Sequence, residues 1–597
     1  MTSRYQVFLG ALPDVCPRDT RRMVFTADAG GRCEVFTWDA AARSARQVTD
    51  RPGGTVHCAI DADAYVWWFE EDTEGRGRWW YQPFMGGPRL PGLPGAPAGL
   101  PRGLAVTAGG TVAAAFAGRR DTTVLVGRRG RVPREVLRTP VAGRLGGITP
   151  DGDLVALAAA PDDEAAVTVL TATGRVTAVL PGPGGPGARL WCQGFSPRPG
   201  RRELLLVQDL GDRYAPATWT PETGLTTHHW CTFDTEITAR WYPDRDEVLV
   251  RQDRHGRSLL HRIALHTRRR QVVPTPAGSL LDAAARPGGS LHYLWTDTAH
   301  PPVLRSTDGT PLPPPGPSPV VPGRHTDLWT PTPDGPVHTL LSLPETDGAA
   351  PAPAVFLVHG GPADQDRDAY DATVHSLVAS GYAAVRVNYR GSTGYGPRWR
   401  RAFGAGVGHT QVHDLAAVRA DLVRRGLVAD GASALWGVSW GAYLVLLALG
   451  SHPGLWQAGV AVKPVADWVT AHRTTTPALR ALDVRLFGGT PDEVPERYAH
   501  SSPLTYADGV TAPLLVVGAT RDTKCPPEQI RTYLAALGAA GVEHEAMWLD
   551  TGHDGYDGAA HIAVLRRSLR FLRDRLPGPA AGDPERPPAR LGGPRPR

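Results

Sequence analysis

Residues 433–450, SALWGVSWGAYLVLLALG, decide the fold of the C-terminal half of the chain. They contain the motif G-x-S-x-G at 437–441. The short apolar run 434–436 before the motif predicts a buried strand, and the Ala/Leu-rich run 442–449 after it predicts a helix. Strand, sharp turn and helix form the context that a nucleophile elbow requires. We therefore interpret Ser439 as a nucleophile. The alternative is a serine in an ordinary connecting turn.

Strands and helices alternate on both sides of this motif. A hairpin is predicted over 329–345, and helices over 411–425 and 528–537. Buried strands are predicted at 354–358, 383–387, 434–436, 458–462, 513–517 and 545–549. Alternation of this kind predicts a mainly parallel sheet with helices on both faces. We expect an α/β-hydrolase domain.

Two further polar residues follow strands of this sheet, at the edge where functional groups gather. Asp522 follows the strand at 513–517, and His553 follows the strand at 545–549. The order Ser439, Asp522, His553 is that of α/β-hydrolases. His553 would take the serine proton, and Asp522 would orient the imidazole. A lone Asp or His in such a place is most often a cap or a loop residue, so the prediction rests on the combination.

A glycine-rich loop follows the strand at 354–358. It reads His359-Gly360-Gly361-Pro362. Glycines let backbone N–H groups approach a substrate oxygen closely, which is the role of an oxyanion loop.

The first half of the chain has a different pattern. Short Val-, Leu-, Trp- and Thr-rich runs are separated by Gly, Pro and Asp turns, and they recur about every 45 residues. Seven units begin near Arg22, Val56, Leu104, Leu145, Gln193, Ile237 and Leu281. This pattern favours a seven-bladed β-propeller. A β-sandwich array, a solenoid, or a ring of six or eight blades are the alternatives.

Composition suggests where the domains divide. The stretch 311–322, PLPPPGPSPVVP, is typical of a stiff connector. We predict a propeller over 1–325, a catalytic domain over 326–576 and a disordered Pro/Gly/Arg-rich tail over 577–597.

Charge and cysteine content exclude several classes of protein. The net charge is only +5 in 597 residues, and the basic residues form no stripe, so we expect no nucleic-acid partner. No apolar run reaches membrane-spanning length, and the first residues have neither a basic head nor an apolar core, so we expect no membrane span and no secretory signal. The six cysteines are scattered, which favours free thiols in the cytoplasm. We expect no cofactor and no metal.

Two smaller features are ambiguous. Only Lys463 and Lys524 are lysines among 64 basic residues, and both follow strands that end at the predicted site, so we expect them near the substrate. Cys525 stands beside Lys524 and is either reactive at the edge of the site or buried and inert. The acidic run at 70–72 could bind a peptide N-terminus, but a solvated turn is the simpler interpretation.

Several segments together resemble the prolyl oligopeptidase family of serine peptidases, nearest its acylaminoacyl-peptidase-like and dipeptidyl-peptidase-like branch. They are VFLVHGGP (355–362), VNYRGSTGYG (387–396), WGVSWGAY (436–443), 487–522 and DTGHDGY (550–556). The resemblance implies an N-terminal propeller, an oxyanion hole formed by Gly361 and the N–H of Trp440, and a site lined by 388–392, including Tyr389. The family often has an arginine where this chain has Lys524, so that substrate contact is carried over less securely.

We therefore expect a serine peptidase for short peptides, of an aminopeptidase, acylaminoacyl or dipeptidyl type, with the propeller as a size filter. Tentative substrate-binding residues are His359, Gly360, Tyr389, Lys524 and Lys463. An esterase or amidase for a small metabolite is the alternative, and a catalytically dead binding protein is a third. The sequence leaves homo-oligomerisation open.

Overall fold

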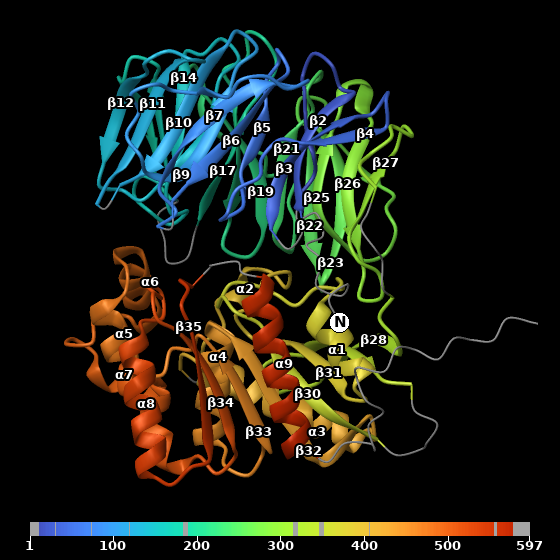
Figure 1. The fold of residues 1–597 in the computed structure, drawn as a ribbon, viewed down its shortest axis with the longest axis vertical. Coiled ribbons are helices and arrows are strands. Elements are labelled where there is room, and N and C mark those ends of the chain that lie inside the picture. The colour runs from blue at the N-terminus through green and yellow to red at the C-terminus, as the bar shows by residue number, and fades with distance from the viewer. Residues whose placement is uncertain are drawn as a thin grey trace, which may run out of the picture.

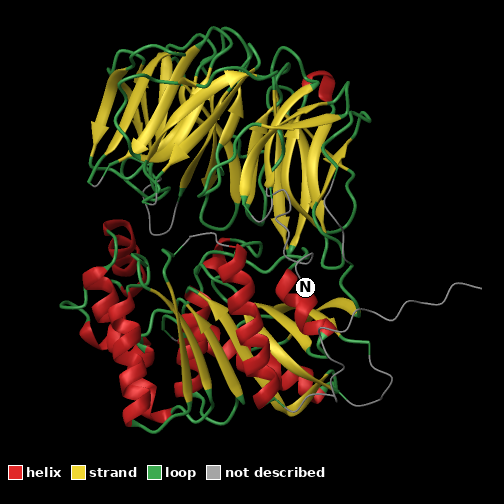
Figure 2. Ribbon diagram, in the orientation of Figure 1, coloured by secondary structure: helices red, strands yellow, loops and turns green. Residues whose placement is uncertain are grey.

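The protein is described here from a computed structural model, in which an all-β body lies above an α/β body (Figures 1 and 2). The predicted tail lies outside the described residues. The structure describes residues 11–29, 32–72, 74–118, 120–182, 189–314, 320–345, 351–404, 406–553 and 558–576.

The all-β body consists of seven antiparallel sheets, which confirms the predicted seven-bladed propeller. The first three sheets contain β1 (Asp14–Val15), β2 (Arg22–Asp28), β3 (Cys33–Asp39), β4 (Ser44–Gln47); β5 (Cys58–Ile60), β6 (Tyr65–Glu71), β7 (Gly77–Pro83), β8 (Leu90–Pro91); β9 (Leu100–Val106), β10 (Thr111–Ala117), β11 (Thr122–Arg128) and β12 (Arg134–Thr139). The next three contain β13 (Arg144–Ile148), β14 (Leu154–Ala158), β15 (Val167–Thr171), β16 (Val176–Leu180); β17 (Leu190–Phe195), β18 (Leu204–Asp209), β19 (Tyr214–Thr220), β20 (Gly224–Thr227); β21 (Ile237–Trp241), β22 (Glu247–Arg254), β23 (Arg257–Ala264) and β24 (Arg269–Val273). The seventh contains β25 (Ser279–Ala285), β26 (Leu291–Thr296) and β27 (Val303–Ser306).

Turn chemistry and side-chain alternation produce these blades. In the turn before β14, Gly152 has φ 81°, a value that favours glycine, and the Thr149 hydroxyl donates to Asp151. Hydrophobic clusters fill the space between neighbouring sheets; one of them joins Leu154 of β14 to Trp219 of β19. Each blade therefore buries its apolar side chains against the next.

Hydrogen bonds join the first and last blades of the ring. The N–H of Leu12, just before β1, donates to Asp282 of β25 over 3.1 Å. Arg286 donates to the carbonyl of Pro13 over 3.2 Å.

The α/β body is built on an eight-stranded sheet in the order β28-β29-β31-β30-β32-β33-β34-β35. Pairing is antiparallel from β28 to β31 and parallel from β31 to β35. Its strands are β28 (Arg324–Thr330), β29 (Val337–Leu343), β30 (Ala352–Val358), β31 (Ala383–Asn388), β32 (Val428–Val438), β33 (Ala458–Val462), β34 (Leu514–Ala519) and β35 (His544–Leu549).

Helices cover both faces of this sheet, as predicted. One apolar cluster packs α3, α4 and α8 against one face, and another packs α1 and α9 against the other. Among the described residues, no helix is both long and apolar enough to cross a bilayer. The α-helices are α1 (Ala372–Ala379), α2 (Pro397–Arg400), α3 (His409–Arg424), α4 (Trp440–Ser451), α5 (Trp468–Thr474), α6 (Pro477–Phe487), α7 (Pro495–Ser501), α8 (Pro527–Ala539) and α9 (Gly558–Arg575); short 3₁₀ turns are η2 (Pro287–Gly289) and η3 (Pro503–Gly509).

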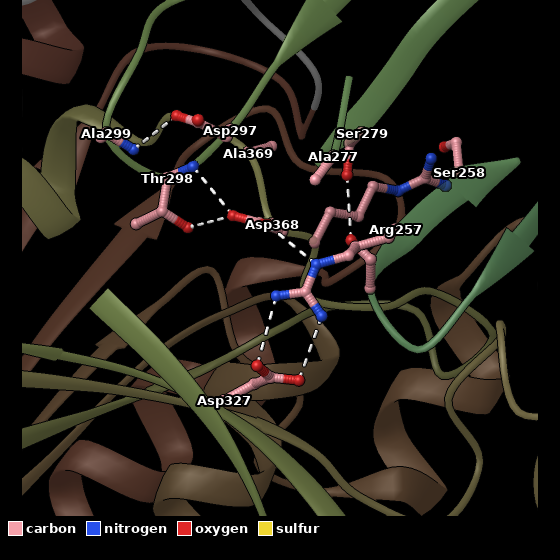
Figure 3. Close-up of polar contacts among 12 residues, drawn as sticks. Arg257, Ser258, Ala277, Ser279, Asp297, Thr298, Ala299, Asp327, Asp368 and Ala369 are labelled. Carbon is pink, nitrogen blue, oxygen red and sulfur yellow. Dashed lines mark hydrogen bonds and ion pairs between the residues drawn. The ribbon is translucent and has the colours of Figure 1, made fainter. Parts of the chain in front are cut away.

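An arginine of the propeller joins the two bodies (Figure 3). Arg257, at the start of β23, forms ion pairs of 3.1 Å with both Asp327 of β28 and Asp368. The other oxygen of Asp368 accepts hydrogen bonds from the N–H and hydroxyl of Thr298, at 3.0 and 2.9 Å. On another part of the interface, Arg400 of α2 binds Asp209 of β18 over 2.7 Å.

Candidate active site

Ser439 lies at the turn between β32 and α4, as the motif predicts. Its backbone has φ 57° and ψ −120°, a conformation that non-glycine residues rarely adopt. The flanking glycines are a steric requirement. A Cβ on Gly437 would lie 2.3 Å from the carbonyl carbon of Gly441, and a Cβ on Gly441 would lie 1.9 Å from the carbonyl oxygen of Val358. The turn is therefore a strained, tightly packed elbow.

The structure brings the three predicted side chains into one hydrogen-bonded chain. His553 Nε2 lies 3.0 Å from Ser439 Oγ, and His553 Nδ1 lies 2.7 Å from Asp522 Oδ2. Because an ionised carboxylate only accepts hydrogen bonds, Nδ1 carries the proton and Nε2 is left to accept from the serine hydroxyl. This is the tautomer that a general base for Ser439 needs.

Backbone groups hold Asp522 in place. Its Oδ1 accepts the N–H groups of Lys524 and Cys525, each over 2.8 Å. Asp522 is only 4% exposed, and these hydrogen bonds fix the orientation of its carboxylate.

Lys463 holds the backbone of the loop that carries His553. This buried residue follows β33, and its ammonium donates to the carbonyls of Gly552 and His553 over 2.9 and 2.8 Å. Its backbone has φ 54°. The rarity of lysine in this chain predicted Lys463 near the site, with its ammonium on the substrate. The contact of the ammonium with the histidine loop was not predicted.

The glycine-rich loop lies against the elbow. A Cβ on Gly360 would lie 3.4 Å from the carbonyl oxygen of Val438 and 3.8 Å from Ser439 Cβ. Gly361 follows with φ 133°, a conformation open to glycine. Trp440 is the first residue of α4, so its N–H belongs to the helix N-terminus, where partial positive charge gathers.

Tyr389 fixes this loop from behind. Its hydroxyl donates to the carbonyl of His359 over 2.7 Å, and the two rings stack at 4.2 Å. Burial lowers the pKa of His359, whose Nε2 lies 2.8 Å from Ser392 Oγ. Since Tyr389 is fully buried, these contacts position the loop. A direct contact of His359, Gly360 or Tyr389 with a substrate stays a prediction.

Lys524 and Cys525 differ sharply in exposure. Lys524 is exposed, whereas Cys525 is only 3% exposed. Burial, reinforced by the charge of Asp522, raises the pKa of the Cys525 thiol well above its ordinary range. Of the two sequence interpretations, the structure favours the buried, unreactive thiol.

Ligand-type atoms of Asp522, Cys525 and His553 lie within 4.8 Å of one another. Because Asp522 and His553 already bind each other, we interpret this group as the surroundings of Ser439 and assign no metal to it.

The acidic run of the propeller is engaged in local contacts. Glu70 forms ion pairs with Arg51 and Arg89 at 3.2 and 2.6 Å. The carboxylate of Asp72 accepts the N–H groups of Glu74 and Arg76. These contacts agree with the turn interpretation.

Comparison with known proteins agrees with this geometry. The sequence profile of the prolyl oligopeptidase family matches residues 368–578. The C-terminal domain belongs to the prolyl oligopeptidase family of serine peptidases. Dipeptidyl aminopeptidase BIII of Pseudoxanthomonas mexicana is 30% identical over 227 residues, which cover 36% of this chain and 33% of that protein. Dipeptidyl peptidase 4 of Bos taurus is 25% identical over 246 residues, or 40% of this chain and 31% of the other. The matches thus span about a third of these relatives.

Solved structures extend the likeness to both domains. A puromycin hydrolase aligns with a TM-score of 0.79 at 18% identity, over 97% of this chain and 100% of its own. The acylaminoacyl peptidase of Pyrococcus horikoshii aligns with a TM-score of 0.74 at 16% identity, over 94% of this chain and 95% of its own. At such identities the likeness establishes the shared fold alone, a propeller followed by an α/β domain.

Proposed function

We propose that this protein is a serine peptidase that hydrolyses short peptides through an acyl-enzyme. The observation that carries the proposal is the hydrogen-bonded chain Asp522–His553–Ser439 at a nucleophile elbow. The family of the C-terminal domain supports the same conclusion.

In the proposed reaction, Ser439 Oγ attacks the carbonyl carbon of the scissile bond while His553 Nε2 takes the hydroxyl proton. Asp522 stabilises the imidazolium. The backbone N–H groups of Gly361 and Trp440 would bind the oxyanion of the tetrahedral intermediate. His553 then gives its proton to the leaving amine, and water hydrolyses the acyl-enzyme by the same steps.

The position of the site supports a restriction to small substrates. Ala363 and Thr393, from loops beside Gly361 and Ser392, form walls of a cavity of about 630 Å³ whose other walls come mostly from the propeller. That volume is typical of a site for a small ligand. We propose that the propeller limits access to short peptides and that the activity is of an aminopeptidase, acylaminoacyl or dipeptidyl type.

We also propose that the protein acts in the cytoplasm, which its six free thiols support.

A second candidate is hydrolysis of a small amide or ester, because a triad of this kind acts on any acyl group that reaches it. The structural likeness to a puromycin hydrolase favours an aminoacyl amide within this class.

A substrate panel separates the candidates. It contains aminoacyl-, dipeptidyl- and N-acyl-aminoacyl-p-nitroanilides, puromycin, p-nitrophenyl esters and an intact folded protein, each assayed with wild type and Ser439→Ala. The proposal expects turnover of one peptide-type class and none of the intact protein. Turnover of esters or puromycin alone would favour the second candidate, and digestion of the intact protein would refute the size filter.

A further inference from the structure

The cavity described above is lined mainly by residues of the propeller. Its walls include residues of β13, β17, β21 and β25, the first strands of four successive blades. On the hydrolase side it reaches Ala363 of the loop that carries Gly361. Ser439 itself does not line the cavity, so a substrate bound to Ser439 would reach this space only by extending past Ala363.

Positive charge dominates the cavity wall. Five arginines line it against two acidic residues, an excess of three formal charges; these residues are Arg144, Arg189, Arg240, Arg251, Arg400, Glu236 and Asp282. A low-dielectric cavity strengthens the effect of such an excess on a charged ligand.

Three of the arginines are held by the protein itself. Arg240 forms an ion pair with Asp282 at 3.0 Å, and Arg400 forms one with Asp209 at 2.7 Å. Arg251 donates to the carbonyls of Leu280 and Leu281 over 3.0 and 2.9 Å. These three have structural partners.

The other two are Arg144 and Arg189. Within the described part of the chain, neither Arg144 nor Arg189 makes a side-chain hydrogen bond or ion pair, and the Nε of Arg189 is buried without an acceptor. Burial and the nearby charge of Arg400 lower the pKa of Arg189. Arg144 is exposed, whereas Arg189 is partly buried, and an unpaired guanidinium that is partly buried costs stability unless a ligand compensates it.

The nearby acids of the described chain form no ion pair with Arg189 and bind other arginines instead. Asp209 is shared by Arg400 and Arg401, and Asp162 pairs with Arg485 at 3.1 Å. The protein therefore leaves a site for an external anion on the propeller side of the cavity.

We propose that Arg189, assisted by Arg144, binds a carboxylate of the substrate. The planar guanidinium matches a carboxylate with two parallel hydrogen bonds. The carboxylate is the free C-terminus of a short peptide or the side chain of an Asp or Glu. This inference rests on the proposed peptidase function and specifies its substrate class.

Four peptides distinguish the two sources of the carboxylate. Ala-Ala-Ala is compared with its C-terminal amide, and Ala-Glu-Ala amide is compared with Ala-Gln-Ala amide. Cleavage is measured with wild type, Arg189→Gln and the control Arg175→Gln, an exposed arginine of the turn between β15 and β16 that does not line the cavity. Binding to the full-length Ser439→Ala protein is measured by calorimetry with the same peptides, so the result does not depend on turnover.

We expect wild type to prefer one carboxylate peptide over its uncharged partner by about ten- to a hundred-fold in kcat/KM or Kd. Arg189→Gln should lose this preference while keeping the uncharged peptide within about two-fold, and Arg175→Gln should keep it. Because Arg189 has no partner among the described residues, its replacement should not lower Tm. Equal binding of charged and uncharged peptides by Ser439→Ala, or a preference that survives Arg189→Gln, would overturn the inference. If these peptides bind with a carboxylate preference but are never cleaved, the peptidase proposal fails and the binding site stands.

Discussion

Charged side chains around Ser439 have hydrogen-bond partners within the protein, whereas the wall of the propeller cavity contains one that has none among the described residues. Beside Ser439, the carboxylate of Asp522 accepts three hydrogen bonds and the ammonium of Lys463 donates two. In the cavity, Arg189 has no partner among the described residues. A satisfied network fixes catalytic groups before the substrate arrives, whereas an unsatisfied charge gains from the arrival itself. On the two proposals above, the first region serves chemistry and the second serves substrate recognition.

The largest effect should come from the satisfied network. Ser439→Ala should lower kcat by about 10⁴- to 10⁶-fold, because the remaining groups act only through the missing hydroxyl. A fluorophosphonate probe should label wild type and not the variant. Thr474→Ala, in an exposed position outside the network, serves as the control. Retained labelling of Ser439→Ala would remove this serine from the mechanism.

A second prediction concerns Asp366, whose carboxyl is an exception to the satisfied hydrogen bonding of the hydrolase site. Asp366 follows the oxyanion loop, its Oδ2 is buried without a partner, and burial raises its pKa to about 7. The unfolded carboxyl titrates near 3.8, so the folded state holds its proton over a wider pH range. Stability should therefore fall as pH rises from about 4 to about 7, by up to roughly 4 kcal/mol, and stay low above that.

Asp366→Asn tests this directly. The variant should match wild type in Tm near pH 4 and exceed it at pH 8, because the amide never ionises. Thermal melts at both pH values are the measurement. An unchanged difference in Tm between wild type and variant across this range would show that Asp366 is paired by water or solvated at high pH.

Lys463 also tests this comparison, because its ammonium binds backbone carbonyls of the histidine loop. Lys463→Met keeps the length of the side chain and removes its two hydrogen bonds to the histidine loop. We expect kcat to fall by about ten- to a hundred-fold, as charge-assisted hydrogen bonds of this kind contribute roughly 1.5–3 kcal/mol. KM should change little. A rise in KM with kcat preserved would instead assign Lys463 to substrate binding.

The smallest effect is expected for Lys524, the exposed lysine of the same edge. Lys524→Ala should raise KM by a few-fold to about ten-fold with little loss of kcat, because an exposed ammonium contributes ground-state binding that solvent weakens. Steady-state kinetics of both lysine variants make each the control for the other. A change of less than two-fold for every substrate would mean that Lys524 is a surface residue without a role in binding.

The sequence predicted the hydrolase part well because its signals are local. Gly437 and Gly441 flank Ser439 in one stretch, and Asp522 and His553 each follow a recognisable apolar strand. The propeller was predicted from its repeat, and each of the seven units coincides with one observed sheet.

The contacts that the sequence could not predict join residues far apart in the chain. The ammonium of Lys463 reaches carbonyls about ninety positions away. The cavity gathers Arg144, Arg189, Arg240 and Arg251 from three blades. In a chain with 62 arginines, nothing in the local sequence distinguishes Arg189, which has no partner among the described residues. Likewise, the burial of Cys525 depends on how its loop packs, which its neighbours in sequence do not reveal.

The ion pairs of Arg257 make the contact between the two domains depend on the salt in the surrounding solution. They connect β28 and Asp368 to the propeller, and their side chains are partly exposed, so dissolved ions screen them. Moving the two domains apart would separate these charges, and dissolved salt reduces the work of that separation. Ionic strength should therefore set how readily the two domains part, and with it how fast molecules enter the space between them.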